Sequence, residues 1–123
     1  MDYWSRKARC AVGLVVALSA TGASAATATW FATITGFIID DSDFGGCMIG
    51  VSPDASVQSG TGDCPATWLS LDCAGSFNTK SQGQTKLSQA QLAYVLGKQV
   101  RVRANNQKKA NGYCVGERVD LFD

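Results

Sequence analysis

The chain has 123 residues, of which 17% are charged, and its formal net charge is +1. It contains no histidine, which excludes Ser-His-Asp and Cys-His catalysis and histidine metal sites. The near balance of charge gives no electrostatic reason to expect nucleic acid or an anionic membrane as a partner.

Residues 1–25 have the pattern of a secretory signal peptide. Three basic residues precede an apolar run at 11–20, and Ala-Ser-Ala at 23–25 supplies the small residues of a cleavage site before Ala26. The run is too short to cross a bilayer, which takes about 20 residues, although an uncleaved membrane anchor is the alternative. We therefore expect a secreted or periplasmic protein without a remaining membrane span, in which residues 26–123 form a single domain.

Cleavage would leave 8 basic and 9 acidic residues, a net charge near −1. It would also leave an even number of cysteines, Cys47, Cys64, Cys73 and Cys114. An even number in a short exported chain predicts a disulfide framework. A structural zinc site is the less favoured alternative.

A long first strand is expected at Thr29–Ile39. Its alternation puts five residues on one face: Trp30, Ala32, Ile34, Gly36 and Ile38. Gly36 at the midpoint predicts a bulge or sharp bend. A turn-rich connector at 40–46 leads to a second strand at Cys47–Ser52, and a polar loop covers 53–65.

A third strand is expected at Thr67–Cys73, followed by a loop at 74–83. Helical spacing then predicts a helix of three to four turns within 84–98, whose inward residues are Leu87, Ala90, Ala93, Tyr94 and Leu96. Gly97 and Lys98 should end it. A fourth strand at 99–104, a polar turn at 105–112 and a last strand at 113–122 complete the chain.

The order β-β-β-α-β-β predicts a mostly β fold with one helix, an OB-fold-like five-stranded barrel stabilised by disulfides. An open α+β sheet is the alternative. In such a barrel the second and third strands are antiparallel neighbours, so Cys47 should pair with Cys73. The third and fifth strands close the barrel in parallel, so Cys64 should pair with Cys114.

No catalytic or nucleotide-binding motif is present, so we expect neither an enzyme nor a cofactor. The acidic residues Asp40, Asp41 and Asp43 could bind calcium, but solvated turn residues are the favoured interpretation. Trp30 and Trp68 are interpreted as core or interface residues rather than as surfaces on which a ligand stacks.

A ligand site is predicted in and after the fourth strand. Basic, amide and aromatic side chains there can hydrogen-bond to and stack on a sugar, as OB-folds do with this connector and the faces of strands two and three. The predicted contacts are Arg101, Arg103, Lys108, Lys109, Asn111 and Tyr113.

Several of these features resemble the binding (B) subunits of AB5 toxins, in particular those of the subtilase cytotoxin and pertussis-like groups. The resemblance lies in the signal peptide, the cysteine-bearing OB-like order, Trp68 with Ser70, and the run QAQLAYVLGKQVRV, and at motif level it covers residues 64–104. It implies an exported, non-catalytic domain that forms ring-shaped oligomers, usually pentamers, and binds glycans of the sialic acid type. No sugar-contacting position of that family can be matched here. A structural or inhibitory protein that acts by protein contact is the alternative function.

Overall fold

The first strand, β1 (Thr27–Ile39), is long and changes partner at a bulge. The computed structural model describes residues 26–65 and 67–122, so the predicted signal peptide lies outside the described residues. Trp30, Ala32 and Ile34 are buried, as their alternation predicted. The register with the next strand shifts between Ile34 and Gly36, which confirms the bulge. Residues 27–32 therefore pair with one neighbour and residues 33–39 with another.

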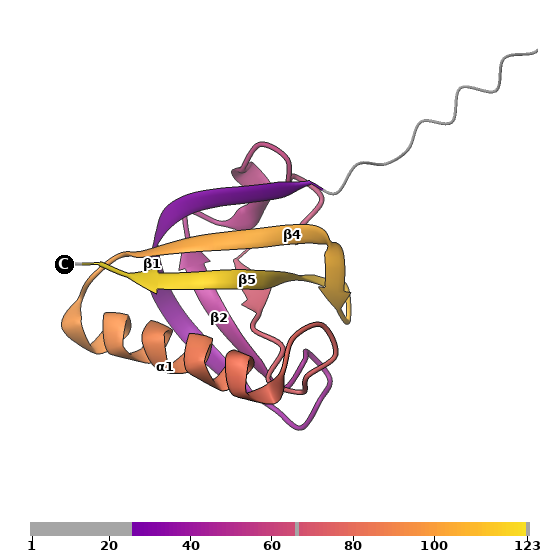
Figure 1. Cartoon of the computed structure of the whole chain (residues 1–123). Helices are drawn as coiled ribbons and strands as arrows, with labels where there is room; N and C mark the ends of the chain where they lie inside the picture. The colour runs from indigo at the N-terminus through magenta and orange to yellow at the C-terminus, as the bar shows by residue number, and fades with distance from the viewer. Residues whose placement is uncertain (1–25, 66, 123) are drawn as a thin grey trace, which may run out of the picture.

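The other strands close the sheet into a ring (Figure 1). They are β2 (Cys47–Ser52), β3 (Trp68–Ser70), β4 (Val100–Ala110) and β5 (Tyr113–Leu121). Their spatial order is β1-β2-β3-β5-β4, and β4 returns to pair with β1. All pairs are antiparallel except β3 with β5, which is parallel and has a single pair in register, Ser70 with Val115. The fold is thus a mixed five-stranded ring.

Two helices interrupt the strands. The short 3-10 helix η1 (Ala55–Val57) lies between β2 and β3, and α1 (Lys80–Leu96) lies between β3 and β4. Thr79 caps α1 in a capping box with Gln82, so the helix begins before the expected residue 84. Gly97 ends it with a φ of 66°, as expected.

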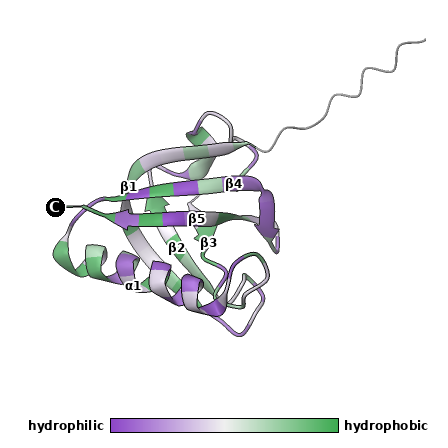
Figure 2. Ribbon diagram, in the orientation of Figure 1, coloured by the Kyte–Doolittle hydropathy of each residue, from purple (hydrophilic) through white to green (hydrophobic). Residues whose placement is uncertain are grey.

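One side of α1 packs on the ring, beside β1, β2 and β5 (Figure 1). Leu87, Ala90 and Ala93 are buried, as the helical spacing predicted. Tyr94 and Leu96 were expected to point inward with them, but both are 54% exposed. Tyr94 instead meets Phe37 at the edge, with ring centroids 5.5 Å apart. The last turns of α1 therefore present apolar side chains to solvent, which Figure 2 shows as green ribbon.

Disulfides join Cys47 to Cys73 and Cys64 to Cys114, and this is the pairing that the strand order predicted. In each, the Cα atoms are 5.5 Å apart. Two such bonds indicate a protein that folds in an oxidising compartment outside the cytoplasm. No helix within residues 26–65 and 67–122 combines the length and the hydrophobicity that a membrane crossing requires.

Two strand boundaries differ from the prediction by more than two residues. The third strand ends at Ser70, because Asp72 takes a left-handed conformation (φ 56°) that turns the chain away. The segment 105–110, expected as part of a polar turn, continues β4. The turn is only Asn111–Gly112, both with positive φ, which suits a two-residue hairpin.

Candidate functional site

The six residues predicted to bind ligand lie along β4 and its turn, and they do not share a pocket. The four basic side chains are each engaged by a carboxylate, at distances of 2.9 to 3.4 Å: Arg101 by Asp120, Arg103 and Lys108 by Glu117, and Lys109 by Asp63. Tyr113 packs on Phe44, and Asn111 is an exposed turn residue. Lys108 and Lys109 lie in the strand and not in a connector. Of the six, only Lys108 lines a hollow described below.

The expectation that strands two and three offer open faces is wrong. Every residue of β2 except Ser52 is buried, and so are Leu69 and Ser70 of β3. Trp68 is half-buried because its ring lies over two glycines: a Cβ added to Gly36 or Gly50 would stand 3.4 Å from it. Trp30 belongs to the core, and its Nε1 donates to the Pro53 carbonyl at 2.8 Å.

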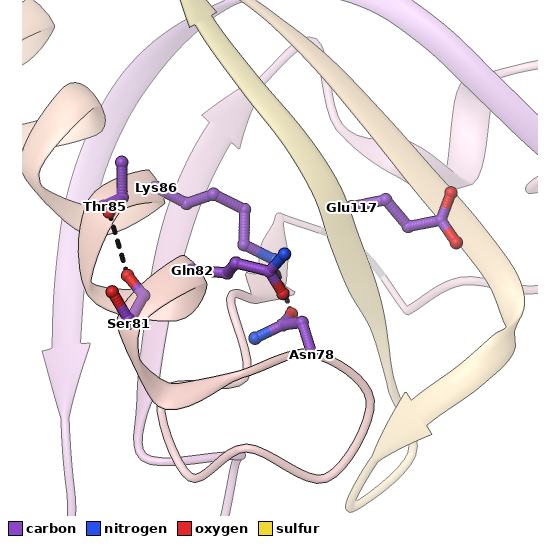
Figure 3. A pocket seen from close by; sticks show the side chains of 6 residues that line it. All are labelled: Asn78, Ser81, Gln82, Thr85, Lys86 and Glu117. Atoms are coloured by element: carbon purple, nitrogen blue, oxygen red, sulfur yellow. Dashed lines mark hydrogen bonds between the residues drawn. The ribbon is translucent and has the colours of Figure 1, made fainter.

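A polar cleft of about 340 Å³ opens between the first turns of α1 and β5. We name it the Lys86 cleft, and Figure 3 shows the six residues that line it: Asn78, Ser81, Gln82, Thr85, Lys86 and Glu117. A smaller hollow shares Asn78 and Glu117 with it and adds Phe77, Lys108 and Val115. The Phe77 ring is 44% exposed. Polar side chains and an exposed ring thus gather at one place.

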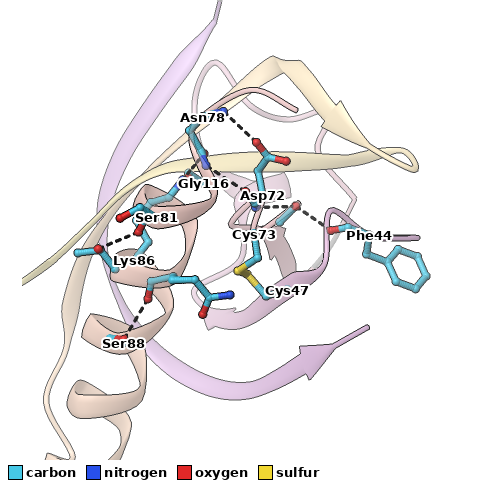
Figure 4. Close-up of a disulfide and its surroundings, with 12 residues drawn as sticks. Phe44, Cys47, Asp72, Cys73, Asn78, Ser81, Lys86, Ser88 and Gly116 are labelled. Carbon is cyan, nitrogen blue, oxygen red and sulfur yellow. Dashed lines mark hydrogen bonds between the residues drawn. A yellow bond between two sulfur atoms is a disulfide. The ribbon is translucent and has the colours of Figure 1, made fainter. Parts of the chain in front are cut away.

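The loop in front of α1 is held by the buried carboxylate of Asp72 (Figure 4). Its Oδ1 accepts from the Ser76 amide at 3.0 Å, and its Oδ2 accepts from the amides of Phe77 and Asn78 at 2.6 and 2.9 Å. Burial alone would raise the pKa of Asp72, but these three donors hold that pKa below its usual value. The carboxylate therefore stays charged and fixes the position of Asn78.

Asn78 in turn fixes Lys86. Its amide nitrogen donates to the carbonyls of Asp72 and Thr79, and its Oδ1 accepts from Lys86 Nζ at 2.8 Å. Lys86 Nζ also donates to the Gly116 carbonyl at 2.7 Å. Burial lowers the pKa of Lys86 to about 8, against the opposing effects of the Asp72 and Glu117 charges. A positioned amine with a pKa of about 8 therefore stands at the wall of the cleft.

Glu117 borders the cleft but is directed toward β4 (Figure 3). Its carboxylate accepts from Lys108 and from Asn105, both at 2.9 Å, and it also pairs with Arg103. The hydrogen bond from Lys108 is the main reason that the pKa of Glu117 lies below its usual value. Glu117 is thus saturated by partners on β4.

A second hollow lies on the other side of the α1 N-terminus, where the β1–β2 connector meets Lys80 and Gln84. Asp41 and Asp43 of that connector are exposed, as expected of turn residues. Both carboxylate oxygens of Asp40, however, are buried and have no hydrogen-bond partner among the described residues. Within that part of the chain no three His, Cys, Asp or Glu side chains come close enough to hold a metal ion.

The Lys86 cleft was not found from the sequence, because its residues come from a loop, a helix and a strand that are far apart in the chain. One local signal was present: Thr79-x-x-Gln82 is the pattern of a capping box and places the start of α1. Chemically, the cleft can hydrogen-bond to a small polar ligand, and Phe77 in the neighbouring hollow offers a ring for stacking. Comparison with protein-family models, curated proteins and solved structures finds no match.

Proposed function

We propose that this chain is an exported, non-catalytic binding module whose ring of strands is an OB-fold barrel. The support is the strand order β1-β2-β3-β5-β4 with a helix between β3 and β4, which is the chain order of that fold. Small barrels of this kind are often scaffolds for oligosaccharide recognition. The resemblance to AB5 binding subunits stays a prediction on which this proposal does not depend.

The ligand we propose is a glycan, held in the Lys86 cleft. The observation that carries this is the lining: six polar side chains beside the exposed ring of Phe77. Sugars present many hydroxyl groups and an apolar ring face, so a site for them needs donors, acceptors and an aromatic surface together. Glycan binding would then involve Lys108 but not the other five residues of the predicted β4 site.

A glycan array with residues 26–123 tests the proposal, with sialylated and neutral glycans side by side. Phe77→Ala and Ser81→Ala should reduce any signal at least several-fold. Ser88→Ala is the matched control, since Ser88 is exposed on the same helix outside the cleft. Silence of the folded protein across the array would refute glycan binding, and equal loss in Ser88→Ala would place the site elsewhere.

Binding to another protein chain is a second candidate function, because the C-terminal end of α1 is apolar and exposed. Leu92, Val95 and Leu96 are 47%, 81% and 54% exposed and lie at helical spacing on one face. An apolar stripe of this kind is typical of an interface. It would suit either a ring-shaped homo-oligomer, as the predicted resemblance implies, or an inhibitor with a different protein partner.

Size-exclusion chromatography with light scattering distinguishes these assemblies, since a pentameric ring gives about five protomers and a free inhibitor gives one. Val95→Lys should dissociate an assembly that uses the stripe. Gln91→Lys, which adds the same charge at an exposed position of α1, is the control. An oligomer that withstands Val95→Lys does not use this face.

A further inference from the structure

Lys86 and Gln82 in the Lys86 cleft each have an N–H group that no atom of residues 26–65 and 67–122 accepts. Lys86 Nζ donates two of its three N–H groups, to Asn78 Oδ1 and to the Gly116 carbonyl. Gln82 accepts from the Thr79 amide through Oε1, which leaves its Nε2 without a partner. Both side chains line the cleft, as Figure 3 shows. Two donors on one wall of a cleft can donate together to a single ligand that carries an acceptor.

The charges around these donors favour an acceptor that is negative. Among the described residues the Lys86 ammonium donates only to the neutral oxygens of Asn78 and Gly116, and the charged groups around it are Asp72, Glu117 and Lys108. Asp72 is already satisfied by three backbone amides, and Glu117 is shared between two cations. The half-buried ammonium therefore has no carboxylate within hydrogen-bond distance, and an oxyanion would supply one.

We propose that the Lys86 cleft binds an oxyanion group of its ligand, a sulfate ester or a sugar carboxylate, between Lys86 Nζ and Gln82 Nε2, and that binding requires the protonated form of Lys86. This inference rests on the proposed binding function of the cleft and adds the chemical class of the group that is recognised. It also makes the affinity dependent on pH.

The direction of that dependence follows from the groups that face Lys86. Asp72 from the loop and Glu117 from β5 remain ionised at neutral and alkaline pH, since the pKa values of both are lowered, and Lys108 faces Lys86 from β4. Because the pKa of Lys86 is about 8, the fraction of charged Lys86 falls about tenfold between pH 7 and pH 9. Affinity for an oxyanion should fall about tenfold over the same interval.

Titration of residues 26–123 with inorganic sulfate, glucuronate and glucose, followed by amide chemical shifts at pH 7 and pH 9, tests this. Sulfate or glucuronate should shift the signals of residues 78–86 and bind about tenfold more weakly at pH 9. Glucose differs from glucuronate only in a CH2OH group in place of the carboxylate, and it should bind at least tenfold more weakly than glucuronate. Which of the two anions binds tells a sulfate ester from a sugar carboxylate.

Three variants separate charge from structure. Lys86→Arg should keep binding at both pH values, whereas Lys86→Met should lose it. Lys80→Met removes the same charge from the same helix outside the cleft and should change nothing. Gln82→Glu keeps an acceptor for the capping box, so the helix start is preserved, but it replaces the free donor by a carboxylate and should abolish binding.

Three results would each overturn the inference. They are equal anion affinity at pH 7 and pH 9, glucose binding as strong as that of glucuronate, and full binding in folded Gln82→Glu. A glycan array that reports only neutral sugars, lost in Phe77→Ala, would overturn it while the proposed function stands. Anion binding at Lys86 together with a glycan array that shows no signal would overturn the proposed glycan binding and leave this inference standing.

Discussion

The carboxylate of Asp72 holds the loop that leads into α1. It is fully buried and accepts hydrogen bonds from three consecutive backbone amides, at Ser76, Phe77 and Asn78. Buried charges are tolerated only when they are satisfied in this way. Because Asn78 then positions Lys86, the shape of the cleft depends on a residue that does not line it.

Asp72→Asn should therefore lower the free energy of unfolding by about 2–3 kcal/mol, since an amide nitrogen would face a backbone donor in a buried site. Asparagine tolerates the positive φ of this position, so the backbone is not an added cost. Urea denaturation measures the change. Asp41→Asn, at an exposed turn, should stay within about 0.5 kcal/mol, and a similarly small effect at Asp72 would contradict the role given to its charge.

Lys86 should make stability rise with pH above 8. Its folded pKa of about 8 lies below the ordinary value of 10.5, so between these pH values the unfolded chain binds more protons than the folded one. The free energy of unfolding then increases with pH across that window. Urea denaturation at pH 7.5 and 9.5 should show this gain in the native protein and not in Lys86→Met. The same slope in both proteins would assign the effect to another group.

The sequence pointed to basic residues of β4 as the site, and the structure shows that these side chains already have carboxylate partners. The sequence cannot show that a basic side chain is already paired. Here each pairs with a carboxylate of another segment: Arg101 with Asp120, Arg103 with Glu117 and Lys109 with Asp63. Lys86 and Gln82 sit in an unremarkable polar helix. The position of the Lys86 ammonium is fixed by Asn78 and Gly116, which lie outside the helix and which periodicity cannot reveal.

At the scale of elements, α1 lies close to the ring because of a glycine. A Cβ at Gly83 would come within 2.7 Å of the Asp72 carbonyl and 2.8 Å of the Cys73 Cα. The helix therefore packs backbone to backbone on the segment that carries one disulfide and the Asp72 carboxylate. This contact sets the distance between the start of α1 and the segment 72–73.

Gly83→Ala should destabilise the protein by about 1–3 kcal/mol through overpacking, although glycine to alanine in a helix ordinarily stabilises it by about 1 kcal/mol. Thermal and urea unfolding measure the sign. Ser88→Ala on the exposed face of the same helix should have an effect within about 0.5 kcal/mol. A stabilised Gly83→Ala protein would show that the helix can move away without cost.

Most elements could be predicted from local pattern. The bulge near Gly36, the bounds of β2 and the end of α1 at Gly97 each follow from a short signal. The errors arise where side chains compete with strand or turn propensity. Asp72 ends β3 early by capping the next loop, and segment 105–110 stays in β4 because β5 pairs with it, despite its polar composition.

At the scale of the whole molecule, the ring is closed most weakly between β3 and β5. The antiparallel neighbours share three to eight pairs in register, but β3 and β5 share only Ser70 with Val115. The Cys64–Cys114 disulfide lies beside this seam, since Cys114 immediately precedes Val115. The covalent bond therefore takes the place of missing strand pairing.

Removing the Cys64–Cys114 disulfide should consequently lower the free energy of unfolding more than removing the Cys47–Cys73 disulfide. The separations of 50 and 26 residues correspond to about 4 and about 3.5 kcal/mol of loop entropy, and only the first loss falls on a seam with one strand pair. Urea denaturation of Cys64→Ala/Cys114→Ala and Cys47→Ala/Cys73→Ala measures the order. Hydrogen exchange at residues 68–70 and 113–116 should accelerate in the first variant before the rest of the sheet. If exchange instead rose uniformly, the ring would open as one unit, and strand pairing at the seam would be sufficient without the disulfide.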